Sequence, residues 1–170
     1  MFAVRFAFVL FLFFLFASAM FAQTEQERMS LGLGVEFNMN SRFNFSAGAT
    51  MSFDYVLPYG FATGFFIKYS HNFSDTAVIE ALATLRRYFS QTPYSGFFAQ
   101  ADIGFFYMIE NEVYQIDGEE VEINKTWPLF NIGIRGGYRL PFGNIFYVEP
   151  YARLGYPFAF GVGIMAGIKF

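Results

Sequence analysis

The residues that could perform nucleophilic or acid–base chemistry are few, and the densest group is Ser70, His71 and Asp75. A serine, a histidine and an acid form a hydrolytic site only when the three side chains converge in space. Ser70 and His71 are neighbours on a predicted strand, where successive side chains point to opposite faces. The spacing argues against a triad, so we expect no catalytic residues. A lipid-modifying barrel enzyme is the catalytic alternative.

Metal and cofactor sites are also poorly supported by the composition. The chain has no cysteine, and His71 is its only histidine. These counts exclude disulfides, thiolate metal sites, a cysteine nucleophile and a histidine-based metal cluster. The net charge is −3 and no basic tract occurs, so nucleic acid is not an expected partner. We expect neither a metal nor a cofactor.

The segment 110–125 is the longest insertion between predicted strands, and it is strongly acidic. Its six acids are Glu110, Glu112, Asp117, Glu119, Glu120 and Glu122. Asp117-Gly118 lies between two β-prone segments, which is a hairpin signal, and no calcium-loop pattern is present. The segment therefore predicts a hairpin that extends two strands beyond the fold and is a candidate site for an extracellular ligand. The alternative is a solvated loop without a ligand.

Eight segments alternate between apolar and polar or small residues, with the period of two that is specific to β-strands. The predicted strands span 30–39, 43–55, 61–71, 77–89, 97–109, 126–140, 145–156 and 160–170. The alanine content of 77–89 also suits a helix, but its alternation favours a strand. The chain is therefore predicted to be all-β, with an up-and-down antiparallel meander.

The two faces of these strands differ sharply in charge. The apolar face carries one charged residue, Arg87, at a strand end from which its long side chain can reach water. An eight-stranded barrel has an interior only wide enough for side chains to fill, so a chain with 27 Phe and 11 Tyr cannot place its apolar face inside. We predict a closed transmembrane barrel with this face toward lipid. The alternative is a soluble, lipocalin-like barrel with the apolar face inward.

The opposite, polar face is then expected to fill the lumen. Its eleven charged residues are Glu36, Asp54, Lys68, Glu80, Arg86, Asp102, Arg135, Arg139, Glu149, Arg153 and Lys169. We expect them to form a packed network of ion pairs, because an unpaired charge in a narrow lumen costs several kcal/mol. The alternative is a narrow porin-like channel, gated by pairs such as Glu149 with Arg135 or Arg153.

Aromatic residues on the apolar face fall near the strand ends. If both termini lie on the periplasmic side, the outer ends carry Tyr69, Tyr107 and Tyr156, and the inner ends carry Tyr55, Phe89, Tyr138 and Phe170. Two such girdles are typical of outer-membrane barrels. The same orientation places the acidic insertion outside the cell.

Residues 1–22 have the pattern of a secretory signal peptide, with Arg5 before the apolar run 6–16. Cleavage after Ala19 and cleavage after Ala22 both fit, and residues 23–170 would form the mature barrel domain. The alternative is a single membrane-anchor helix, for which the apolar run is barely long enough.

The pattern resembles the small eight-stranded outer-membrane barrels of the OmpA/OmpX type. Segment 160–170 resembles the C-terminal signal that the barrel-assembly machinery reads, with Val162, Ile164, Ala166, Ile168 and Phe170 on one face. Segment 148–158 resembles the penultimate strand of a family of uncharacterised bacterial outer-membrane barrel domains. Pro150 departs from the pattern, because it falls in mid-strand on the lipid face, where we expect a bulge.

The resemblance implies a place in the outer membrane of a double-membrane bacterium. The implied partners are outer-membrane lipid and, during insertion, the barrel-assembly machinery. From the residues and the resemblance together, we expect a non-enzymatic, monomeric protein with a structural or surface-interaction role.

Overall fold

The computed structural model describes residues 28–39, 45–72, 76–90, 95–116, 119–156 and 158–170, with 110–116 and 119–127 described by strand pairing alone. The predicted signal peptide lies outside these residues. The strands are β1 (Met29–Met39), β2 (Phe45–Val56), β3 (Phe61–Asn72), β4 (Thr76–Tyr88), β5 (Gly96–Ile116), β6 (Glu119–Phe142), β7 (Phe146–Tyr156) and β8 (Phe160–Lys169). A short 3-10 turn, η1 (Pro58–Gly60), joins β2 to β3.

The eight strands form a closed barrel in chain order, and every neighbouring pair is antiparallel. β1 and β8 close it, and beyond β8 the N–H groups of Met29 and Phe170 donate to each other's carbonyl oxygens at 3.0 and 2.9 Å. Closure pairs the backbone groups that a sheet edge would leave free. The predicted fold, a closed eight-stranded up-and-down meander, is confirmed.

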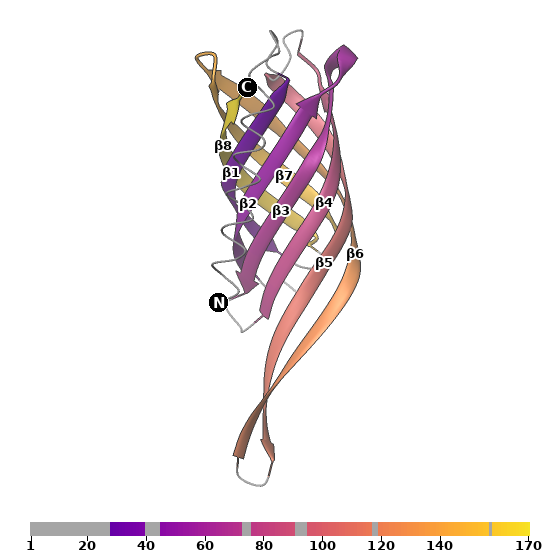
Figure 1. Ribbon diagram of the computed structural model, residues 1–170, viewed down its shortest axis with the longest axis vertical. Helices are drawn as coiled ribbons and strands as arrows, with labels where there is room; N and C mark the ends of the chain where they lie inside the picture. Colours follow the sequence, from indigo (N-terminus) through magenta and orange to yellow (C-terminus); the bar gives the residue numbers. More distant parts are fainter. Residues whose placement is uncertain (1–27, 40–44, 73–75, 91–94, 117–118, 157) are drawn as a thin grey trace.

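The strands agree closely with the alternation in the sequence. β4 is a strand over its whole length, so the helical interpretation of its alanine-rich sequence is excluded. β5 and β6 pair as far as Ile116 and Glu119, which confirms the predicted extension of both strands. Figure 1 shows this β5–β6 hairpin projecting far from the barrel, at the end opposite the C-terminus.

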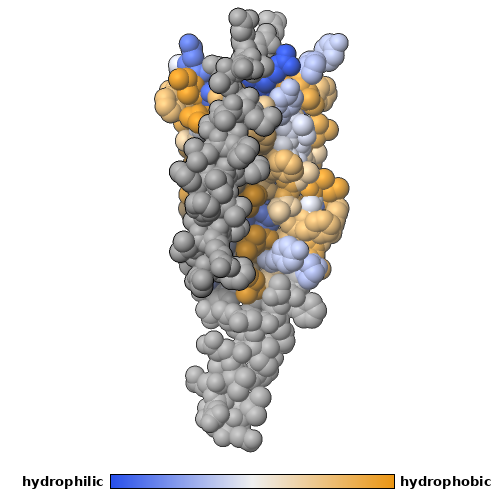
Figure 2. Space-filling model, in the orientation of Figure 1, coloured by the Kyte–Doolittle hydropathy of each residue, from blue (hydrophilic) through white to orange (hydrophobic). Residues whose placement is uncertain are grey.

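Side-chain burial alternates along each strand, with large apolar residues outside. In β3, Phe65 and Tyr69 are more than half exposed, whereas Phe66 and Lys68 are fully buried. Apolar residues predominate over the visible wall in Figure 2, and the most hydrophilic residues gather at its upper rim. No helix in the described part of the chain is long and apolar enough to cross a membrane.

The predicted bulge at Pro150 is wrong. Backbone pairing between β6 and β7 stops at Gly137–Tyr151 and resumes at Leu140–Val148, with the register unchanged. On the other side, Pro150 pairs with Ile164 without a shift. Proline has no N–H to donate, and here the strand accommodates this by a local gap in pairing instead of an inserted residue.

The aromatic residues predicted for the two girdles lie toward the ends of the barrel. Tyr69, Tyr107 and Tyr156 are exposed in the half of the wall nearer the β5–β6 hairpin. At the other end, Phe89 and Tyr138 are exposed, and Tyr55 and Phe170 are half-buried.

Arg87, the one charged residue predicted on the apolar face, lies at the C-terminal end of β4. Its guanidinium donates to the carbonyl oxygen of Tyr59 in the η1 turn. It also lies 4.6 Å from the centre of the Phe61 ring. The charge therefore lies at the rim of the barrel.

Candidate functional site

The lumen of the barrel contains the main concentration of charge in the described chain. Ten of the eleven predicted lumen charges are at most 2% exposed: Glu36, Asp54, Lys68, Glu80, Arg86, Asp102, Arg135, Arg139, Glu149 and Arg153. These are five acids and five bases, so the buried set is formally neutral. The eleventh, Lys169, is half-buried at the end of β8.

Four of these residues form a cluster near the end of the barrel that carries the η1 turn. We call it the turn-end cluster, and it consists of Asp54, Arg86, Arg139 and Glu149. Arg139 Nε lies 2.5 Å from Glu149 Oε2, and Arg86 NH1 lies 2.9 Å from the same oxygen. Asp54 Oδ2 accepts from Arg139 at 3.0 Å and lies 3.4 Å from Arg86. Two acids and two arginines from four strands therefore neutralise one another across the lumen.

A second group, the hairpin-end cluster, consists of Glu36, Lys68, Glu80 and Arg153. Lys68 Nζ lies 2.9 Å from Glu36 Oε1 and also pairs with Glu80. Arg153 donates to Glu80 Oε2 at 2.7 Å and lies 3.5 Å from Glu36 Oε1. Asn131 donates to the same Glu80 oxygen at 2.6 Å. This cluster is also neutral.

Arg135 and Asp102 lie between the two clusters and pair at 3.1 Å. Gln100 extends the network, because it donates to Asp102 at 2.6 Å and accepts from the Arg86 guanidinium at 2.7 Å. The Arg135 guanidinium also stacks 3.7 Å from the centre of the Phe66 ring. Arg153 Nε lies 3.9 Å from Asp102 Oδ2, so the ten charges belong to one connected network across the lumen.

The predicted pairing of Glu149 with Arg135 or Arg153 is wrong. Glu149 contacts Arg86 and Arg139, whereas Arg135 and Arg153 pair with other acids. The reason is the register: Arg135 lies opposite Arg153, which is four residues along β7 from Glu149. The alternation of the sequence identifies the face of each residue, but its height in the lumen depends on the stagger between strands.

Among the uncharged residues of the network, Gln100 and Asn131 were missed by reasoning that followed charges alone. Both are buried, and both contact a carboxylate and an arginine. The available signal was their place on the polar face of strands 97–109 and 126–140.

Glycines make room in the lumen for inward-pointing rings. A Cβ added at Gly163 would overlap the Tyr151 ring, and one added at Gly137 would lie 2.6 Å from the Phe98 ring. Tyr151 in turn donates to Glu36 at 2.9 Å. Ring packing and ion pairing therefore depend on each other.

Replacing Gly163 by valine is expected to destabilise the barrel by about 1–3 kcal/mol, the usual cost of overpacking a filled interior. The added side chain would displace Tyr151 from Glu36. Gly136→Ala is the matched control, because its Cβ would point to the outer wall, 3.9 Å from the nearest atom. Unfolding in lipid vesicles measures both, and equal stabilities would contradict this packing.

The residues of the rejected triad do not converge. Ser70 is buried in the lumen, whereas His71, the next residue, is exposed on the outer wall. Asp75 lies outside the described residues. Across the described chain, no group of three or more His, Asp or Glu side chains is placed to hold a metal ion.

Comparison with known proteins identifies the fold. The N-terminal β-barrel domain of Pseudomonas aeruginosa OprF is similar with a TM-score of 0.57 and 14% identity, over 85% of this chain and 100% of that domain. Neisserial surface protein A is similar with a TM-score of 0.55 and 10% identity, over 84% of this chain and 96% of that one. Both are eight-stranded outer-membrane barrels. No protein-family model matches the sequence, and no curated protein matches it.

Proposed function

We propose that this chain is an outer-membrane protein of a double-membrane bacterium whose lumen is closed by ion pairs and whose β5–β6 hairpin acts outside the cell. In this proposal the barrel is a monomeric, non-enzymatic anchor, and its role is structural or surface interaction. Residues 1–22 serve as the export signal, and segment 160–170 is read by the assembly machinery.

The burial of the charged side chains is the observation that supports a closed lumen. Each of the ten buried ions is at most 2% exposed, whereas residues lining a water-filled pore would be in contact with water. Buried charges are tolerated when they are paired, and each charged side chain of the two neutral clusters has an oppositely charged partner. A porin-like path would require the clusters to separate, which would leave charges unpaired in a narrow space.

The hairpin supports a role in surface interaction because of its reach and its sequence. In the described residues β4 pairs with β5 only up to Glu110, and β7 pairs with β6 only from Ile132. Beyond these points the two strands form a free ribbon, and backbone edges of this kind accept partner strands. Its sequence carries six acids and one base, Lys125, between 110 and 125, so a basic partner fits best.

Deleting residues 112–122 is expected to leave the barrel folded and to abolish binding to basic surface proteins. The deletion removes the ribbon and five of its six acids, but none of the lumen contacts. Binding of the purified barrel to immobilised basic polypeptides, measured against salt concentration, checks the expectation.

The control is a hairpin of unchanged length in which Glu112, Glu119, Glu120 and Glu122 are replaced by glutamine. It keeps the backbone edges and removes charge, so loss of binding in this variant attributes recognition to the acids. Full binding by the deletion variant would contradict the proposed role while leaving the closed lumen unaffected.

A further inference from the structure

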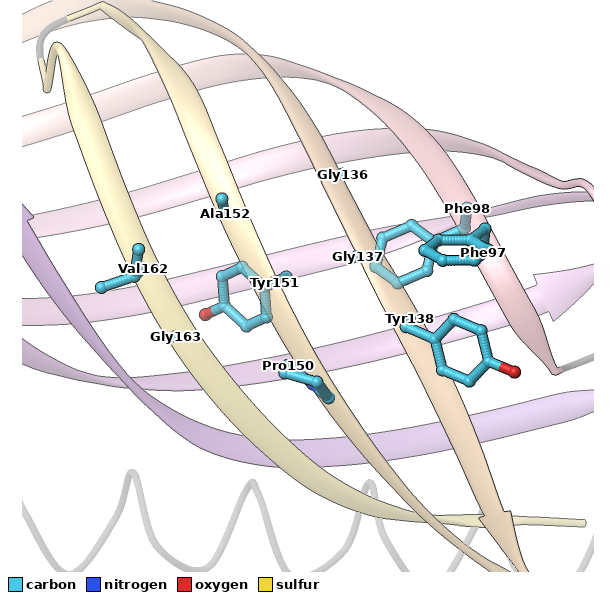
Figure 3. A pocket seen from close by; sticks show the side chains of 10 residues that line it. All are labelled: Phe97, Phe98, Gly136, Gly137, Tyr138, Pro150, Tyr151, Ala152, Val162 and Gly163. Atoms are coloured by element: carbon cyan, nitrogen blue, oxygen red, sulfur yellow. The ribbon is translucent and has the colours of Figure 1, made fainter.

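The outer wall of the barrel carries a groove with a volume of about 670 Å³ that crosses β5, β6, β7 and β8. Figure 3 shows Pro150 and Ala152 near its middle, with Phe97 and Tyr138 together on one side and Val162 on the other. The residues that line it in the described chain include no charged side chain. The groove is therefore an apolar hollow within an apolar wall.

The hollow exists because outward positions that are large elsewhere are small here. Gly136 and Ala152 face each other across β6 and β7, and Pro150 is exposed two residues along. Their outward neighbours Ile134 and Leu154 are 61% and 51% exposed and give the wall its usual thickness. A Cβ at Gly136 would meet only the Phe98 carbonyl oxygen, at 3.9 Å.

The floor of the groove consists of side chains that belong to the lumen. Pairing between β6 and β7 is interrupted beside Pro150, and Gly137 has no side chain to cover the interruption. The rings of Phe98 and Tyr151 lie directly beneath and line the groove. At this seam two buried lumen rings, only 3% and 5% exposed, form the bottom of the groove.

One side of the groove is formed by an aromatic pair. The rings of Phe97 and Tyr138 meet edge to face with centres 4.7 Å apart, a favourable geometry for aromatic contacts. Phe97 is 68% exposed, so the pair projects from the wall beside the hollow of Gly136 and Ala152. A projecting ridge beside a smooth trough fits a linear apolar ligand.

We propose that this groove is a binding site for one acyl chain of a membrane phospholipid. The groove is continuous with the wall that faces lipid, so hydrocarbon chains reach it without crossing water. An apolar pocket selects an apolar ligand, and the absence of charge in its described lining matches a chain and not a headgroup. Elsewhere on the wall large side chains project outward, whereas here an acyl chain can lie over the small residues Gly136 and Ala152, beside the Phe97–Tyr138 pair. The inference does not depend on whether the lumen conducts or on the role of the hairpin.

The test fills the groove and measures retained lipid. The barrel with Gly136→Leu and Ala152→Leu is purified in detergent, incubated with a saturated phosphatidylethanolamine and analysed by native mass spectrometry. Ala81→Leu with Ala83→Leu is the matched control, because both alanines are exposed on the outer face of β4, away from the groove. We expect one retained lipid for the wild type and the control, and its loss from the filled variant.

A second measurement uses the unaltered protein, so that poor folding of the variant does not leave the question open. A phospholipid with a photoreactive group in its acyl chain is reconstituted with the wild-type barrel and cross-linked. We expect cross-links to concentrate at 136–138 and 150–152 relative to 81–83. Even labelling of the wall would overturn the proposal. Equal lipid retention by the filled variant would also overturn it. So would a wild-type dimer that becomes monomeric in the Gly136→Leu, Ala152→Leu variant, because a second copy of the chain would then occupy the groove.

Discussion

Replacing Glu149 by glutamine is expected to lower the free energy of unfolding of the barrel by about 3–5 kcal/mol, the usual cost of removing one partner from a buried ion pair. Glu149 Oε2 receives both Arg139, at 2.5 Å, and Arg86, at 2.9 Å. Without it the two guanidinium groups share Asp54 as their one remaining acid in the turn-end cluster. Urea unfolding of the barrel in lipid vesicles, followed by circular dichroism, measures the change.

The double variant Arg139→Gln with Glu149→Gln, compared with each single variant, separates the loss of the pair from the cost of leaving one buried charge unpaired. It restores neutrality, and Arg86 keeps Asp54 at 3.4 Å, so its stability loss should be smaller than the sum of the two single losses. His71→Gln on the outer wall is the surface control and should lie within about 0.5 kcal/mol of the wild type. A Glu149→Gln barrel as stable as this control would show that the buried pairs contribute no net stability.

Deleting Phe170 is expected to reduce the amount of barrel inserted in the membrane far more than it reduces the stability of the barrel that does insert. The backbone of Phe170 exchanges two hydrogen bonds with Met29, and each contributes only about 0.5–1.5 kcal/mol net. Its ring ends the alternating apolar face that resembles an assembly signal. Quantifying membrane-inserted protein in cells, beside unfolding of the refolded variant, measures both effects.

Phe170→Ala divides the two contributions further, because it removes the ring and keeps the backbone bonds. If the ring is the element recognised, this variant should show nearly the same loss of inserted protein as the deletion. Wild-type membrane levels for both variants would contradict a role of the terminal residue in assembly.

The sequence was sufficient to predict the fold because a period of two reports directly on strands and on their two faces. The predicted strand 61–71 is observed as Phe61–Asn72, and 77–89 as Thr76–Tyr88. The face of each residue follows from parity alone, which is why Lys68 and Glu80 were placed inside. Volume then decided which face meets lipid, because an eight-stranded barrel cannot enclose so many aromatic side chains.

The contacts between side chains were not predictable in the same way. Whether Glu149 meets Arg139 or Arg153 depends on register and stagger, which are properties of strand pairs and not of single strands. The effect of Pro150 was misjudged for a related reason. A strand can accommodate a residue without an N–H either by a bulge or by a local gap in pairing, and the sequence does not distinguish the two. The wall groove combines residues from four strands, and its only sequence signal was small residues, Gly136 and Ala152, on a face otherwise rich in large ones.

Single-channel recording in planar bilayers tests whether the ion pairs close the lumen. Purified wild-type barrel is added at defined protein-to-lipid ratios, with a known porin as the positive control in the same bilayers. We predict no discrete conductance steps from the barrel, because ten buried charges and the rings between them occupy the path. Reproducible discrete openings of the wild-type protein would contradict the closed lumen and favour the narrow channel.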